Sequence, residues 1–219
     1  MVRVLVMVYS RFGVLQRLAD DIVEGAQKVP QVQVHVLPID DVPIDELRPG
    51  ETEDDRARRR TVLVDRLSTA DALIVGAPAY FGTMASPMKR LFEDCLTAAS
   101  PPPNDRSRPW HLALLRDKVG AAFTASGTPH GGNEMALHSI LTMFMHLGMV
   151  VVTPGQAEPL LKNPAAPYGA TAIAGASADR PLSEEEETAA QALGERVARI
   201  AVWLCRGRSE WERSQINRA

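Results

Sequence analysis

The stretch "VRVLVMVYSRFGVLQRLADDIVEGA", residues 2–26, joins three patterns in direct succession. Its first seven residues are apolar apart from one arginine, which is typical of a strand covered on both faces of a sheet. A short polar turn with one glycine follows, and apolar residues then recur at helical spacing. The stretch therefore predicts a strand, a loop and a helix, the repeating unit of a parallel α/β sheet.

The same unit recurs along the chain. Further apolar runs predict strands at residues 32–37, 72–77, 119–125 and 149–152. Apolar stripes at helical spacing predict helices near residues 14–26, 88–96, 133–147 and 183–204. This alternation predicts an α/β fold, with a doubly wound five-stranded parallel sheet and helices on both faces.

The length of 219 residues fits one domain better than two. We place a single domain at residues 1–206 and set residues 207–219 apart as a polar C-terminal tail. Two segments interrupt the alternation: a proline-rich loop at residues 100–110, and residues 154–181, which show little helical or strand pattern. Loops of that length usually serve a site or an interface.

Charge and hydropathy exclude some classes of partner. The formal net charge of -3 gives no basic footprint for nucleic acid. The basic run "RARRR", residues 56–60, follows "TEDD", residues 52–55, which is typical of a helix cap and an acidic first turn. We interpret the two together as a solvated helix face. No apolar stretch has the length that a membrane span requires, so we predict no membrane insertion.

The two cysteines, Cys95 and Cys205, lie far apart and form no metal-binding or redox spacing. Both sit among leucine and alanine, so we predict that they are small buried hydrophobic residues and that the protein has no metal site. The N-terminus lacks the pattern of a secretory signal. Two cysteines without such a signal indicate a reducing compartment, and we expect a cytoplasmic protein.

The loop after the first strand has the features of a phosphate site. In a parallel sheet, ligands bind beyond the carboxyl ends of the strands. Here Ser10 offers a hydroxyl, Gly13 allows close approach, and a helix that begins near Val14 offers free N–H groups. The loop matches neither GxGxxG nor GxxxxGK[ST], which favours a monophosphate over a dinucleotide. A plain Ser/Gly turn that caps a helix explains the loop equally well.

Two later loops suit a planar ring. Tyr80 and Phe81 bring aromatic faces, and the loop after them brings backbone and hydroxyl donors. Packing of both aromatics on the core is the alternative. The stretch "TASGTPHGGNE", residues 124–134, brings hydroxyls and glycines to the same edge of the sheet. A phosphate site combined with a site for a planar heterocycle describes FMN.

Several motifs resemble the WrbA family, and the similarity covers nearly the whole chain. They occur in the family's order: "YSRFGVLQRLADDIVEGA", "ADALIVGAPAYFGTMASPMKRLFED", "KVGAAFTASGTPHGGNE", "HLGMVVV" and "PYGATAIAG". The resemblance implies a flavodoxin-like, FMN-dependent NAD(P)H:quinone oxidoreductase. It also implies a homo-oligomer, a dimer or a tetramer, because "PYGATAIAG" is similar to a stretch that completes a neighbouring subunit's site in tetramers of this family.

The resemblance assigns cofactor-binding residues by position. The phosphate loop corresponds to Ser10, Arg11, Phe12, Gly13, Val14 and Leu15. The loop beside the isoalloxazine corresponds to Pro78, Ala79, Tyr80, Phe81 and Gly82. The loop along the polar edge of the ring corresponds to Thr124, Ala125, Ser126, Gly127, Thr128, Pro129 and His130. Substrate contacts are expected from Phe12, Trp110 and Leu147.

This chain departs from the family pattern at four positions. Tyr80 replaces a usual arginine, Phe12 replaces a tyrosine that contacts nicotinamide, and Leu147 replaces the second of two paired histidines. His130 stands in a loop that usually has only small residues there. These departures concern the acceptor more than the binding of FMN.

The implied reaction is a ping-pong hydride transfer from NAD(P)H to a quinone-type acceptor, in which the flavin carries the chemistry. No covalent nucleophile is expected. His130 and His146 are candidate proton donors, and His146 also suits a plain helix C-terminus. The alternatives are a flavin-binding electron carrier or regulatory flavoprotein, and an NAD(P)H reductase for non-quinone acceptors.

Overall fold

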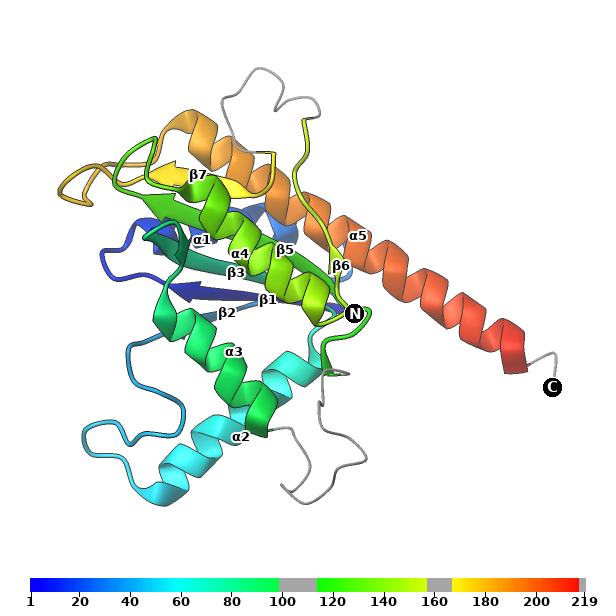
Figure 1. Ribbon diagram of the computed structural model, residues 1–219. Coiled ribbons are helices and arrows are strands. Elements are labelled where there is room, and N and C mark those ends of the chain that lie inside the picture. Colours follow the sequence, from blue (N-terminus) through cyan, green and yellow to red (C-terminus); the bar gives the residue numbers. More distant parts are fainter. Residues whose placement is uncertain (99–113, 157–166, 217–219) are drawn as a thin grey trace.

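The computed structural model describes residues 1–98, 114–156 and 167–216. The proline-rich segment, with Trp110, lies outside these ranges. In chain order the elements are β1 (Val2–Tyr9), α1 (Val14–Gln27), β2 (Val32–Ile39), α2 (Glu53–Thr69), β3 (Ala72–Tyr80), β4 (Thr83–Met84), α3 (Ser86–Ala98), β5 (Val119–Ser126), α4 (Asn133–His146), β6 (Val150–Val151), β7 (Ala170–Ile173) and α5 (Glu184–Ile216) (Figure 1).

The strands form one mostly parallel sheet in the order β2-β1-β3-β5-β6. This is the order of flavodoxin-like sheets, and it confirms the predicted doubly wound α/β fold. The two-residue strand β4 turns back and pairs antiparallel with the end of β3. Because β1, β3 and β5 are neighbours and parallel, the loops that follow them lie at one edge of the sheet.

The fifth strand position is divided between two short strands. Residues 119–120 of β5 pair with β6, whereas residues 123–126 pair with β7. Both pairings are parallel, and residues 152–169 separate β6 from β7 in the chain. Residues 154–181, which show little strand pattern in the sequence, contain the four-residue strand β7. The sequence "ATAI" is too short and too small in its side chains to stand out, and it becomes a strand because the end of β5 offers a free edge.

Two hydrophobic layers cover the sheet, and alternation along β1 shows how. Val4, Val6 and Val8 face the layer under α1 and α5, and Leu5 and Met7 face the layer under α3 and α4. Figure 1 shows α1 and α5 on one side of the sheet and α3 and α4 on the other. The sequence pattern of a strand buried on both faces is thereby explained.

Helices α1 and α5 meet with their backbones almost in contact. A Cβ atom added to Gly194 would lie 1.9 Å from the carbonyl oxygen of Ile22, and one added to Gly25 would lie 1.9 Å from that of Gln191. Both glycines are therefore required by the crossing of the two helices. The crossing buries Leu193 and Val197 of α5 completely.

Helix α5 continues without interruption to Ile216. Residues 207–216, which we had set apart as a tail, are polar but form the last turns of this helix. The predicted cap at its start is confirmed: the N–H of Glu186 donates to Ser183 Oγ, and the N–H of Ser183 donates to a Glu186 carboxylate oxygen.

The two cysteines differ in their surroundings. Cys95 is buried in the layer under α3, and burial raises the pKa of its thiol to about 12. Cys205 of α5 is only partly buried, so the prediction of a buried residue holds for Cys95 alone. Among the helices in the described ranges, none combines the length and apolarity needed to cross a membrane. Within those ranges, no His, Cys, Asp and Glu side chains are grouped to hold a metal ion.

Candidate functional site

The three predicted loops surround one cavity at the carboxyl edge of the sheet. Its volume is about 230 Å³. The predicted residues in its lining are Ser10, Arg11, Phe12, Val14, Leu15, Pro78, Ala79, Tyr80, Ala125, Ser126 and Gly127. The sequence had assigned these residues to three separate loops, and the parallel order of β1, β3 and β5 brings them together. We call this space the FMN-type cavity.

The first loop ends in a cradle at the start of α1. Gly13 has φ +86° and stands as the N-terminal cap without a side-chain hydrogen bond. Its N–H donates to Ser10 Oγ at 3.1 Å, and its carbonyl accepts from the N–H of Arg17 at 3.2 Å. The N–H groups of Val14 and Leu15 therefore remain at a positive helix end, which suits a phosphate.

The loop between β7 and α5 also lines this cavity, and sequence reasoning missed that role. Its contributing residues are Ala174, Gly175, Ala176 and Ala178. Arg180 holds the loop, because its Nη1 atom donates to the carbonyl of Ile173 at 2.7 Å and to Glu186 at 2.9 Å. The motif "PYGATAIAG", which resembles a stretch reaching a neighbouring subunit, thus contributes to the cavity of its own chain.

Arginine side chains near the cradle add positive charge. Arg11 lines the cavity and is exposed. Arg17, which the sequence did not single out, donates from Nη2 to the carbonyl of Arg180 at 3.0 Å. It therefore ties the start of α1 to the loop before α5, on either side of the cradle.

The second loop presents aromatic side chains to solvent. Phe81 is fully exposed at a relative accessibility of 106%, and Phe12 across the cavity is 63% exposed. The alternative in which Phe81 packs on the core is therefore wrong. Phe81 also has φ +53°, a conformation that is uncommon outside glycine and clusters at functional sites.

The hydroxyl groups of Thr124 and Ser126 in the third loop donate to backbone carbonyls of the protein. Thr124 is completely buried, and its Oγ1 atom donates to the carbonyl of Ala77 at 2.7 Å. Ser126 Oγ donates to the carbonyl of Thr128 at 2.8 Å. The Thr124 hydroxyl therefore joins β5 to β3. Pro129 and His130 are exposed and lie outside the cavity lining.

Gly82 and Gly132 allow the second and third loops to pack in close contact. A Cβ atom added to Gly132 would lie 2.8 Å from the Cα atom of Gly82, and both residues have positive φ. The N–H of Met84 then donates to Ser139 Oγ of α4 at 3.0 Å. The aromatic loop is consequently fixed against the start of α4.

Asn133, the first residue of α4, carries an unsatisfied polar atom. It is only 4% exposed, and its Nδ2 atom donates to the carbonyl of Ala172 at 3.5 Å. Its Oδ1 atom is buried and has no hydrogen-bond partner among the described residues. Such an acceptor calls for an explanation, and a ligand donor would satisfy it.

Two predicted site residues lie at the far end of α4. A helix of 14 residues spans about 21 Å, so His146 and Leu147 are distant from the loop that begins α4. Leu147 is 2% exposed and belongs to the hydrophobic layer under α3 and α4. The expected Leu147 contact with substrate stays a prediction, and within one chain the length of α4 separates Leu147 from the three loops. Trp110 lies outside the described residues.

Comparison with known proteins assigns the family. Residues 4–158 match the NADPH-dependent FMN reductase family. The chain belongs to this family. Two relatives, each named NAD(P)H dehydrogenase (quinone), are 35% identical over 210 residues in Gluconacetobacter diazotrophicus and 35% over 213 residues in Chromohalobacter salexigens. Each match covers 93% of this chain and 99% of the relative.

Solved structures agree on the fold of this family member. A WrbA-like flavodoxin from Agrobacterium tumefaciens superposes with a TM-score of 0.60 at 24% identity, covering 93% of this chain and 99% of the other. A flavodoxin from the domain Archaea gives 0.55 at 17% identity, covering 92% and 99%. The predicted flavodoxin-like fold is confirmed.

Membership of the family makes the protein an oxidoreductase with FMN as its cofactor. The FMN-type cavity fits that group. Its lining includes Ser10, Val14 and Leu15 around the anion cradle and the exposed aromatics Phe12 and Tyr80. Asn133, with its unsatisfied buried acceptor, begins the helix that follows the third loop. These are the contacts that a phosphate, a planar ring and the donors on its rim require.

Proposed function

We propose that the protein transfers a hydride from NAD(P)H to a quinone-type acceptor by a ping-pong, two-electron mechanism at the FMN-type cavity. The observation that carries this proposal is the pairing of the cradle at the start of α1 with the exposed aromatics Phe12 and Tyr80 in the lining of one cavity. The names of the curated relatives support a quinone as the acceptor.

Each part of the cavity has a distinct task. The N–H groups of Val14 and Leu15, with the Ser10 hydroxyl, would bind the phosphate of FMN. The Gly127 backbone and the Asn133 Oδ1 atom would meet the polar rim of the ring. Bound FMN would supply the redox chemistry, accepting a hydride from the nicotinamide and passing two electrons to the acceptor.

The exposed aromatic residues explain why NAD(P)H and the acceptor would bind one after the other. Phe12 and Tyr80 are exposed and line the same cavity, so donor and acceptor would occupy the same space in succession. His130 is exposed on the third loop and would serve as a proton donor to the acceptor. His146, at the far end of α4, does not reach this face within one chain.

Anaerobic reduction of the FMN-loaded protein tests this function. We expect NADH or NADPH to bleach the flavin absorbance, and a quinone to restore it. Steady-state rates with quinone, nitroaromatic, azo and ferric acceptors then identify the acceptor class. The variant His130→Gly, which removes the side chain without crowding the loop, is expected to lower turnover about tenfold with acceptors that need a proton.

Two results would contradict these assignments. A protein that gains no flavin spectrum with FMN does not use this cavity as proposed. If FMN binds and neither nicotinamide bleaches it, the protein is an electron carrier rather than a reductase. Unchanged turnover of His130→Gly with every acceptor removes His130 from the mechanism, with the wild-type FMN-loaded protein as the control.

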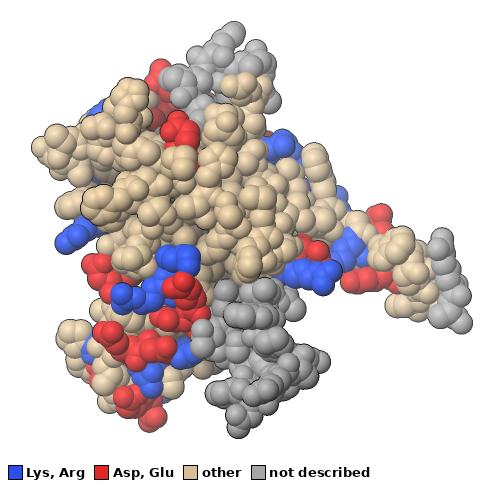
Figure 2. Space-filling model, in the orientation of Figure 1, with Lys and Arg blue, Asp and Glu red and all other residues tan. Residues whose placement is uncertain are grey.

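We also expect a cytoplasmic homo-oligomer, a dimer or tetramer. The face over α4 carries few charged side chains in Figure 2, and Met135 and Met145 of α4 are 64% and 59% exposed. Exposed apolar side chains of this size on a face with few charges are typical of an interface. Light scattering should give a mass above the 23.8 kDa of one chain, and a monomer mass would contradict this expectation.

A further inference from the structure

A second, larger cavity lies outside the FMN-type cavity. Its volume is about 600 Å³, within the range of small-molecule sites. The segment after β2, helix α2 and the first turns of α3 form its walls. We call it the arginine cleft, after the arginines that line it: Arg48, Arg58, Arg59, Arg66 and Arg90. Figure 2 shows charged side chains of both signs concentrated around α2 and the segment before it.

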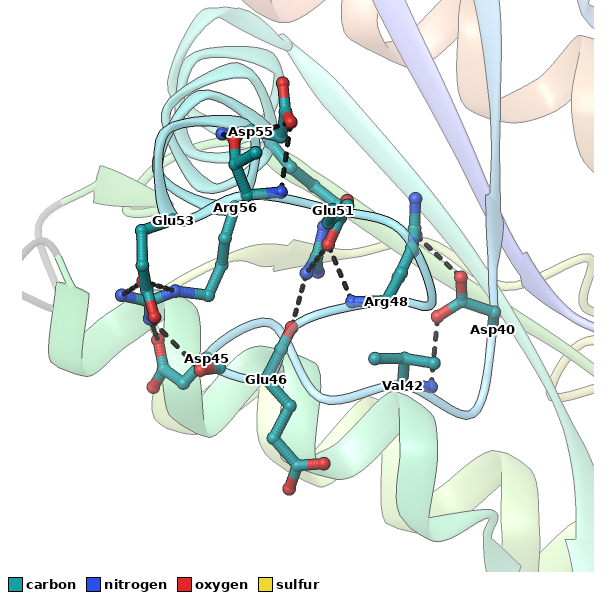
Figure 3. Close-up of polar contacts among 11 residues, drawn as sticks. Asp40, Val42, Asp45, Glu46, Arg48, Glu51, Glu53, Asp55 and Arg56 are labelled. Carbon is teal, nitrogen blue, oxygen red and sulfur yellow. Dashed lines mark hydrogen bonds and ion pairs between the residues drawn. The ribbon is translucent and has the colours of Figure 1, made fainter.

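One wall of the arginine cleft is fixed by ion pairs (Figure 3). Arg59 donates to both carboxylate oxygens of Glu51, at 3.0 and 2.9 Å, and to the carbonyl of Glu46 at 2.6 Å. The backbone N–H of Arg48 donates to Glu51 at 2.8 Å, and its guanidinium pairs with Asp40 at 2.6 Å. The wall therefore needs no ordering when a ligand binds, which favours affinity.

Two other arginines remain available to a ligand. Arg66 of α2 and Arg90 of α3 line the cleft and are exposed. Within the described part of the chain, neither guanidinium forms a hydrogen bond or an ion pair, in contrast to those of Arg48 and Arg59. Guanidinium groups donate in a planar fork that matches the oxygens of a phosphate.

Carboxylates and apolar residues complete the set of groups in the cleft. Asp40 and Asp41 directly follow β2, the position from which a carboxylate bonds a ribose in dinucleotide-binding sheets, where a nearby arginine accepts a 2′-phosphate. Leu37, Leu63 and Leu91 supply an apolar floor against which a base could pack.

Tyr9 connects the arginine cleft to the FMN-type cavity. Tyr9, whose hydroxyl donates to Asp41 at 2.6 Å, immediately precedes Ser10 of the phosphate loop. Ile39 of the cleft is the register partner of Tyr9 across β1 and β2. A single extended ligand could therefore reach from one cavity into the other along the edge of the sheet.

We propose that the arginine cleft binds a phosphorylated nucleoside, with its phosphate on Arg66 and Arg90 and its ribose beside Asp40 and Asp41. This chemistry has two sources: the adenosine 2′-phosphate end of NADPH, or a separate nucleotide. The first source rests on the proposed function and implies that NADPH is a better donor than NADH, which lacks that phosphate.

Direct titration of the FMN-loaded protein with adenosine 2′,5′-bisphosphate tests the cleft. Calorimetry should detect binding to the wild type. The double variant Arg66→Ala/Arg90→Ala should weaken it about a hundredfold, because two charge-assisted contacts are removed. Lys89→Ala is the matched control: Lys89 is a cation beside Arg90 on α3 that does not line the cleft, so affinity should stay within about twofold.

Absence of binding at millimolar concentration, or equal binding by the double variant, would overturn the proposal. Inhibition of turnover by adenosine 2′,5′-bisphosphate separates the two sources. Competition with NADPH, and a raised KM for NADPH but not NADH in the double variant, assign the phosphate to NADPH. Binding without either effect assigns it to a separate nucleotide. Because the titration requires no turnover, failure of the proposed hydride transfer leaves this result intact.

Discussion

The variant Gly194→Ala is expected to lower the free energy of unfolding by about 3 kcal/mol. In an exposed helix, glycine to alanine normally stabilises by about 1 kcal/mol, because alanine loses less backbone entropy. Here the new Cβ atom would lie 1.9 Å from the carbonyl oxygen of Ile22, a backbone atom that cannot rotate away. Helices α1 and α5 must separate instead, which loosens the packing of Leu193 and Val197.

Thermal unfolding at saturating FMN measures this effect, with a fall in Tm of about 6–12 °C for a domain of this size. Gly207→Ala is the matched control, since Gly207 belongs to the same helix and has nothing within 4 Å of its added Cβ atom. It should leave stability unchanged or raise it by up to about 1 kcal/mol. Equal behaviour of the two variants would show that α1 and α5 do not cross closely in solution.

The variant Ser10→Asp is expected to weaken FMN binding by more than about 100-fold. The aspartate would still accept the N–H of Gly13, which Ser10 Oγ accepts at 3.1 Å, so the loop should keep its shape. Its negative charge would, however, face the phosphate directly in the cradle at the start of α1. Repulsion between these charges opposes the attraction of the helix N-terminus.

Fluorescence titration with FMN and with riboflavin measures the two affinities. Ser10→Asn is the control, since it has the same shape and acceptor without the charge, and it should bind FMN within about fivefold of the wild type. Riboflavin has no phosphate, so its affinity should differ little between the two variants. An Asp variant that binds FMN as tightly as the Asn variant would place the phosphate elsewhere.

Much of the fold follows from local patterns. The apolar runs at the start of β1, β3 and β5 are longer than any competing pattern around them, and each had to be covered on both faces. The capping boxes at Thr52 and Ser183 were equally local, since each links residues three positions apart. The phosphate loop belongs here as well, because Ser10 and Gly13 lie within one turn of the same segment.

The sequence did not reveal features that depend on contacts between residues far apart in the chain. The sequence does not reveal that "ATAI" joins β5, because that strand depends on the free edge beside Phe123. Nor does it reveal that the Thr124 hydroxyl donates to the carbonyl of Ala77 on the neighbouring strand. Nor does it give the separation of Leu147 from the loops, which the length of α4 sets within one chain.

The sequence by itself determined the alternating elements, the parallel sheet and the loop that suits a phosphate, because periodicity, caps and turns act over a few residues. Only the tertiary structure decided that the loop after β7 lines the FMN-type cavity, that Gly82 meets Gly132, and that Tyr9 reaches Asp41 of the arginine cleft. Those features are contacts between segments far apart in the chain, and strand order and helix crossings create them.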